Sequence, residues 1–105
     1  MRYKPPDTVT SPRDAISNVE VLYDGGDDSV SVARITWFGN EVLAMRWNIA
    51  LREWDDPEKI NEHKICLGMP VSSGFSTWFI LPDEMFESNS ELSSVLKTLI
   101  KKSVD

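Results

Sequence analysis

The stretch ARITWFGNEVLAMRWN (33–48) constrains the fold more than any other part of the chain. It holds two runs with apolar residues at alternate positions, separated by turn-forming residues, and this pattern is typical of a β-hairpin. A three-residue loop over 39–41 pairs Phe38 with Val42 and places apolar residues alone on one face of the hairpin. We expect this register because a buried face favours the pairing that keeps it uniformly apolar. The residues on the predicted apolar face are Ala33, Ile35, Trp37, Leu43, Met45 and Trp47.

The same register places Arg34 directly opposite Arg46 on the other face of the hairpin, together with Phe38. Like charges opposed across two strands destabilise a sheet by up to about 1 kcal/mol, so a counter-charge is expected beside them. Two explanations remain open. Carboxylates of the protein's own acidic loops or N-terminal segment can pair with the guanidinium groups. Alternatively, the arginines bind an anionic ligand such as a phosphate, with Phe38 as a stacking surface.

The element order predicts an α+β fold, an antiparallel β-meander of four to five strands followed by one C-terminal amphipathic helix packed on one sheet face. The expected strands cover residues 17–23, 29–38, 42–49, 64–69 and 75–81. Residues 1–14 contain three prolines and are expected to form an extended N-terminal arm ahead of a single domain over 15–105.

The C-terminal segment changes to helical periodicity. Ser88 with Glu91 three residues later is typical of a capping box. One helix is a small cover for five strands, so part of the apolar face is expected to stay bare and to close a homodimer interface. The apolar stripe of the helix recurs at helical spacing and comprises Leu92, Val95, Leu96, Leu99 and Ile100.

The 105-residue chain has a formal net charge of −6 and a single cysteine, Cys66. The negative charge argues against tight nonspecific binding to duplex DNA or to an anionic membrane surface. A single cysteine cannot form a disulfide within the chain, which is typical of a reducing compartment. No apolar run reaches the length of a membrane span, and the N-terminus lacks the apolar core of a secretory signal. The sequence therefore predicts a soluble cytoplasmic protein without a membrane partner.

Three short motifs are candidates for a calcium site, a phosphate loop and a nucleophile pair, and each fits a structural role better than a catalytic or binding one. The loop DGGDD (24–28) lacks the ligand spacing of a calcium site, and VSSG (71–74) is not followed by the lysine of a phosphate loop. His63 and Cys66 are expected on opposite faces of one strand, which does not suit a nucleophile pair. The sequence predicts no enzymatic activity, no metal and no cofactor.

The segments TWFGNEVLAMRWN (36–48) and ILPDEMFESNSELSSVLKTLI (80–100) resemble the PC4-type transcriptional coactivators, including their small bacterial members. The shared pattern is a strand ending in Trp, a short turn, a strand with Arg and aromatic residues, and a Leu/Ile-x-x-x-Glu entry into a C-terminal helix. The resemblance implies a homodimer that binds single-stranded DNA across a curved antiparallel sheet, in transcription or replication. It implies nucleic-acid contacts through Arg34, Arg46, Phe38, Arg52 and Trp54.

The alternative is an acidic protein–protein interaction or regulatory protein, of the kind carried by bacterial and phage accessory genomes, that binds no nucleic acid. Its contact surface would be the sheet edge, the loop REWDDPE (52–58) or the N-terminal arm. Single-strand binding requires a positive, aromatic-lined patch, so Arg46→Glu should abolish it and leave thermal stability nearly unchanged. Protein binding predicts instead that Arg34 and Arg46 are neutralised within the protein.

Overall fold

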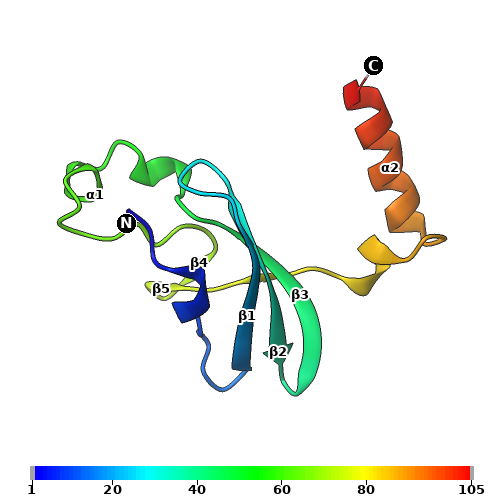
Figure 1. Cartoon of the computed structure of the whole chain (residues 1–105), viewed down its shortest axis with the longest axis horizontal. Helices are drawn as coiled ribbons and strands as arrows, with labels where there is room; N and C mark the ends of the chain where they lie inside the picture. Colours follow the sequence, from blue (N-terminus) through cyan, green and yellow to red (C-terminus); the bar gives the residue numbers. More distant parts are fainter. Residues whose placement is uncertain (1, 105) are drawn as a thin grey trace.

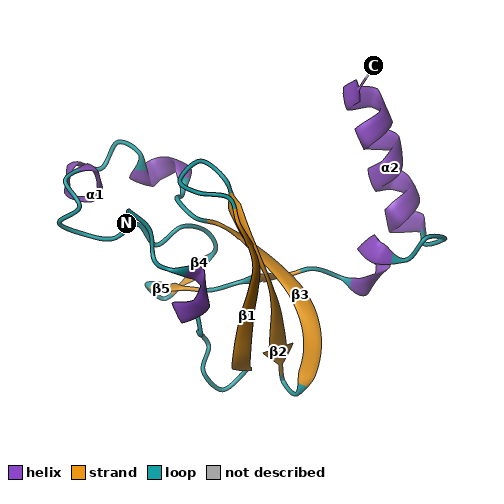
Figure 2. Ribbon diagram, in the orientation of Figure 1, coloured by secondary structure: helices purple, strands orange, loops and turns teal. Residues whose placement is uncertain are grey.

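The computed structural model describes the backbone of residues 2–104 and the side chains of residues 2–98, and it confirms the α+β class (Figures 1 and 2). Four antiparallel strands form the main sheet in the order β1-β2-β3-β6, and β4 and β5 form a separate small hairpin. The elements are η1 (Pro6–Thr8), β1 (Ile16–Asp24), β2 (Val30–Trp37), β3 (Asn40–Trp47), η2 (Leu51–Glu53), α1 (Pro57–Ile60), β4 (Val71–Ser72), β5 (Phe75–Ser76), β6 (Phe79–Ile80), η3 (Asp83–Phe86) and α2 (Glu91–Val104).

The β2–β3 hairpin closes with a two-residue turn at Phe38 and Gly39, not with the expected three-residue loop. Both turn residues have positive φ, 47° and 82°, as a type I′ turn requires. Trp37 therefore pairs with Asn40, and each β2 residue meets a β3 partner three positions earlier than predicted. The predicted register is wrong, and because the shift is odd, it exchanges the two faces of β3.

The observed register buries small and branched side chains and leaves larger ones outside. Ala33 pairs with Ala44 and Ile35 with Val42 on the inner face, where they join the core. Trp47, expected in the core, is 48% exposed. Uniformity of one face did not identify the register because the outer face is also apolar, carrying Val32, Leu43 and Met45.

The N-terminal segment packs into the body instead of forming an arm ahead of it. Val9 is fully buried, and the Trp78 indole Nε1 donates a hydrogen bond of 2.8 Å to its carbonyl oxygen. Tyr3 forms a bridge with Cys66, and its hydroxyl donates to Asp24 Oδ1 at 2.7 Å. Burial and this hydrogen bond raise the pKa of Tyr3 to about 12. The segment thus joins β1 to the region around residues 66–78.

The two long strands expected over 64–69 and 75–81 are short pieces in the structure. Residues 64–69 contribute isolated bridges, one between Cys66 and Tyr3 and one between Met69 and Trp47. From the second segment, β6 pairs with Ala44 and Met45 of β3 and forms the edge of the main sheet. Residues 48–78 therefore form a long connection between β3 and β6, the last strand of the sheet.

Helix α2 stands clear of the sheet (Figure 1), and its principal contact is with η3. Ser90, rather than Ser88, caps the helix, since its Oγ accepts a hydrogen bond of 3.1 Å from the Ser93 N–H. The expected position of the helix on a sheet face is therefore wrong. Leu99 and Ile100 of the predicted stripe lie outside the residues whose side chains are described.

The register is tested by alanine substitution in the hairpin turn. Gly39→Ala is expected to lower the free energy of unfolding by about 1–2 kcal/mol, because a side chain is forced into the left-handed region at φ 82°. Urea unfolding followed by tryptophan fluorescence measures the change. Asn40→Ala serves as the matched control and is expected to cost less. The three-residue loop predicts the reverse order, since Asn40 would then hold the positive φ.

Candidate interaction surface

The two arginines of the sequence hypothesis lie on opposite faces of the sheet and do not meet. Arg34 pairs across the hairpin with Leu43, and Arg46 pairs with Ser31. On the outer face, Arg34 Nε lies 2.9 Å from Glu41 Oε1, and its Nη1 lies 3.3 Å from the Glu20 carboxylate. This arginine is neutralised by the protein's own carboxylates.

Arg46 points into the body of the protein and is only 3% exposed. Its guanidinium donates to the carbonyl oxygens of Thr77 and Leu67, and to that of Pro70 at 3.4 Å. Its charge also lies 5.9 Å from the centre of the Trp78 ring. Burial lowers the pKa of Arg46 to about 10, so the side chain is still a cation at neutral pH. Arg46 therefore holds residues 67–77 against β3 by these hydrogen bonds.

Glu53 is the buried anion of the same region and organises the loops around it. Its carboxylate accepts hydrogen bonds from the backbone N–H groups of Ala50 (3.0 Å), Leu67 (2.7 Å) and Gly68 (2.8 Å), and from Lys59 Nζ (2.8 Å). Burial acts to raise the pKa of Glu53, but these hydrogen bonds outweigh it and the pKa is lowered. The Arg46 and Glu53 contacts together hold residues 67–77 against β3 and η2.

Gly68 allows the backbone of the connection between β3 and β6 to approach β3 closely. A Cβ at this position would lie 2.2 Å from the Trp47 carbonyl oxygen and 2.5 Å from Arg46 Nη2, and the residue has φ 71°. Only glycine fits both this space and this backbone conformation. The close approach brings Met69 beside Trp47, with which it forms a backbone bridge.

The remaining predicted site residues do not gather around the arginines. Phe38 is 64% exposed at the tip of the hairpin, where its ring packs edge-on against Trp37. Arg52 is exposed on η2. Trp54 is partly buried against the cluster of Tyr3, Ile49 and Cys66, and Arg2 lies 4.7 Å above its ring. The five residues therefore do not form one contact surface.

A different surface emerges on the outer face of the sheet. Tyr23, Val32, Met45 and Phe79 are paired in sequence across β1, β2, β3 and β6, so they form one continuous apolar row. Tyr23 is 53% exposed and Phe79 is 61% exposed. We call the surface formed by this row and its neighbours the outer apolar face; its residues are Tyr23, Val32, Leu43, Met45, Trp47 and Phe79.

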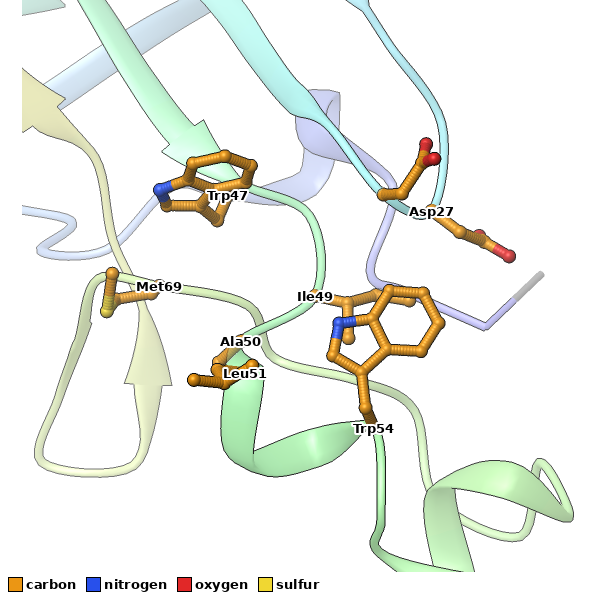
Figure 3. A pocket seen from close by; sticks show the side chains of 8 residues that line it. Asp27, Trp47, Ile49, Ala50, Leu51, Trp54 and Met69 are labelled. Carbon is orange, nitrogen blue, oxygen red and sulfur yellow. The ribbon is translucent and has the colours of Figure 1, made fainter.

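Two hollows extend the outer apolar face at the end of β3. The first, of about 400 Å³, lies over Arg46 and is lined by Met45, Trp47, Met69, Pro70 and Phe79. The second, of about 390 Å³, shares Trp47 and Met69 with the first and continues to Leu51 and Trp54, with Asp27 and Asp28 also in its lining (Figure 3). The surface therefore combines aromatic and thioether groups with an acidic border.

The sequence pattern contained a partial signal for this surface. Residues 75–81 hold apolar side chains in both phases of a strand, which indicated apolar groups on two faces. The same is true of β2 and β3, but the predicted register assigned all their large side chains to the core. The outer apolar face depends on pairings between distant segments, which residue periodicity alone does not determine.

No family model, curated protein or solved structure matches this chain. The resemblance to PC4-type coactivators thus stays a prediction. Within the described residues, no group of three or more His, Cys, Asp or Glu side chains is placed to hold a metal ion. No helix in that part of the chain is long and apolar enough to cross a membrane.

The different settings of the two arginines predict different mutational costs. Arg46→Ala is expected to lower the free energy of unfolding by about 3–5 kcal/mol, because buried carbonyl groups lose their donor and Glu53 loses a nearby cation. Arg34→Ala, which removes a surface ion pair, is expected to cost less than about 1 kcal/mol. Chemical denaturation measures both. Equal losses of stability in the two variants would contradict the structural role of Arg46. This role also means that mutation of Arg46 should destabilise the protein, whereas the sequence predicted nearly unchanged stability.

The lowered pKa of Glu53 predicts a pH dependence. A carboxyl whose pKa is lower in the folded state stabilises the fold above its unfolded value of about 4.5, and this stabilisation is lost as pH falls through the folded pKa. Glu53→Gln is expected to cost about 3 kcal/mol at pH 7 and to flatten the decline in stability below pH 4.5. Denaturation curves between pH 7 and pH 3 test this.

The exposed Glu41 supplies the control, since Glu41→Gln should change stability at pH 7 by less than about 1 kcal/mol. If stability fell with pH in the same way for Glu53→Gln and the wild type down to pH 3, the ionised Glu53 carboxylate would not stabilise the loops around it.

Proposed function

We propose that the protein is a non-enzymatic protein-interaction module that binds a basic, amphipathic segment of a partner protein on its outer apolar face. The observation that supports this most directly is the exposure of Tyr23, Trp47 and Phe79 together on one face of the sheet. Contiguous exposed apolar groups of this kind mark interaction surfaces in water-soluble domains. Aromatic residues and methionines are also the side chains enriched in the cores of protein interfaces.

The acidic border specifies the charge of the partner. Asp27 and Asp28 line the hollow between Trp47 and Trp54, and both are exposed. A partner that buries apolar side chains against Trp47 while placing lysine or arginine near these carboxylates meets complementary potential. Met45 and Met69 add side chains that adapt to the shape of an incoming apolar group.

The placement of the arginines favours this function over single-strand binding. Arg34 is held by two carboxylates and Arg46 by backbone carbonyls, so neither is free to neutralise a phosphate. The chain as a whole has a net charge of −6, which opposes association with a polyanion. The exposed aromatic residues would then contact apolar side chains rather than bases.

A fluorescence-anisotropy titration tests the proposal with defined probes. The first probe is a labelled synthetic peptide of leucine and lysine arranged to give one apolar helical stripe, and the second has the same composition in an order without a stripe. The full chain is expected to bind the striped peptide more tightly. Phe79→Ala should weaken that binding at least about fivefold, as loss of an interface anchor does.

Phe75→Ala is the matched control, because Phe75 is similarly exposed but lies on the small β4–β5 hairpin. Labelled oligo-dT at low and at moderate salt is the third probe, and no binding is expected. Equal affinity for the two peptides, or an unchanged affinity in Phe79→Ala, would contradict the proposal. Binding of oligo-dT that weakens with salt would support the nucleic-acid hypothesis instead.

A further inference from the structure

The described part of the apolar stripe of α2, which is Leu92, Val95 and Leu96, is not buried against the sheet. Val95 is 51% exposed, and Leu92 and Leu96 are only partly buried. The helix contacts η3 and projects away from the sheet (Figure 1). A helix with one apolar stripe is stabilised mainly by burying that stripe against another element. Among the described side chains, both the apolar stripe of the helix and the outer apolar face are therefore left uncovered in the same chain.

The two surfaces match in charge. Residues 91–104 contain three lysines, Lys97, Lys101 and Lys102, and one acidic residue, Glu91. The outer apolar face is bordered by Asp27 and Asp28, on a chain whose net charge is negative. Helix α2 thus has the chemistry that the proposed function assigns to the partner: an apolar stripe on a basic segment.

The two surfaces also match in length. The 14 residues of α2 span about 21 Å, at 1.5 Å per residue. Four adjacent strands extend about 14 Å across a sheet, at a strand spacing of about 4.8 Å. The helix is long enough to cross the row from Tyr23 to Phe79 and to reach the loop with Asp27 and Asp28.

Local contacts direct α2 away from its own sheet. The Leu81 N–H donates to the Leu43 carbonyl oxygen at 2.9 Å, which fixes the chain at the sheet edge. Pro82 and η3 follow, and the Ser90 hydroxyl donates to the carbonyl oxygen of Glu84 while its Oγ caps the helix. These hydrogen bonds hold η3 and α2 as one corner that points outward.

We propose that two copies of the chain exchange their C-terminal helices, so that α2 of each copy covers the outer apolar face of the other. This inference rests on the proposed function and names the partner as a second copy of the chain. Leu92, Val95 and Leu96 pack against Met45, Trp47 and Phe79 of the outer apolar face, and the basic helix lies beside Asp27 and Asp28. The arrangement is symmetric and buries two equivalent interfaces.

Mixing two full-length variants tests the exchange. Phe79→Glu places a charge in the sheet surface but leaves α2 intact, and Val95→Glu places one in the helix but leaves the sheet surface intact. Both residues are exposed in the single chain, so both variants should fold. The wild type is expected to be a dimer by light scattering after gel filtration. Each variant should weaken dimerisation at least tenfold and run as a monomer at the same concentration.

An equimolar mixture of the two variants is expected to form a heterodimer, because one intact helix then meets one intact sheet surface. Phe75→Glu and Ser94→Glu are the controls and should stay dimeric, since Phe75 lies on the β4–β5 hairpin and Ser94 lies opposite the stripe on the helix. A monomeric wild type, a dimeric Val95→Glu variant, or a mixture that stays monomeric would each overturn the exchange.

The striped leucine–lysine peptide separates failure of the exchange from failure of the proposed function. If helix exchange occurs, Val95→Glu binds the peptide more tightly than the wild type, because its outer apolar face is vacated. If the wild type is monomeric and its affinity for the peptide depends on Phe79, the exchange is wrong and the proposed function stands. If the affinity does not depend on Phe79, both are wrong.

Discussion

The buried charges of Arg46 and Glu53 fix the path of the chain between β3 and β6. A cation that is 3% exposed is tolerated only where acceptors surround it, and the carbonyl oxygens of Leu67, Pro70 and Thr77 provide them. Glu53 in turn requires donors, which come from three backbone N–H groups and Lys59. The long connection between β3 and β6 therefore has a defined path, although it contains little regular secondary structure.

This path has a consequence for the surface. The Arg46 and Glu53 contacts bring residues 67–70 against the end of β3, where Gly68 allows the closest approach and Met69 is placed beside Trp47. Pro70 and Phe79 then complete the hollow over Arg46. An arginine that the sequence suggested as a ligand contact thus acts from beneath the surface, by positioning the apolar groups that a partner would touch.

The sequence predicted the first three strands and the C-terminal helix well, but it predicted the two later strands and the relations between elements poorly. The hairpin, the first strand and the C-terminal helix followed from local periodicity, and β1 to β3 begin and end within two residues of the expected bounds. The register failed because Phe38 adopts a left-handed conformation that is uncommon for an aromatic residue, and because both faces of the hairpin are apolar. Burial of Val9, the hydrogen bonds of Arg46 and the outward direction of α2 depend on contacts between distant segments, which no local pattern specifies.

Methyl NMR on a mixed sample tests whether α2 of one copy covers the outer apolar face of another. One population carries labelled methionine methyls and the other carries labelled leucine and valine methyls, so any cross-peak between them is intermolecular. Helix exchange predicts nuclear Overhauser effects from Met45 and Met69 to Leu92 or Val95. Methionine signals that do not change with protein concentration and show no intermolecular cross-peaks would contradict it.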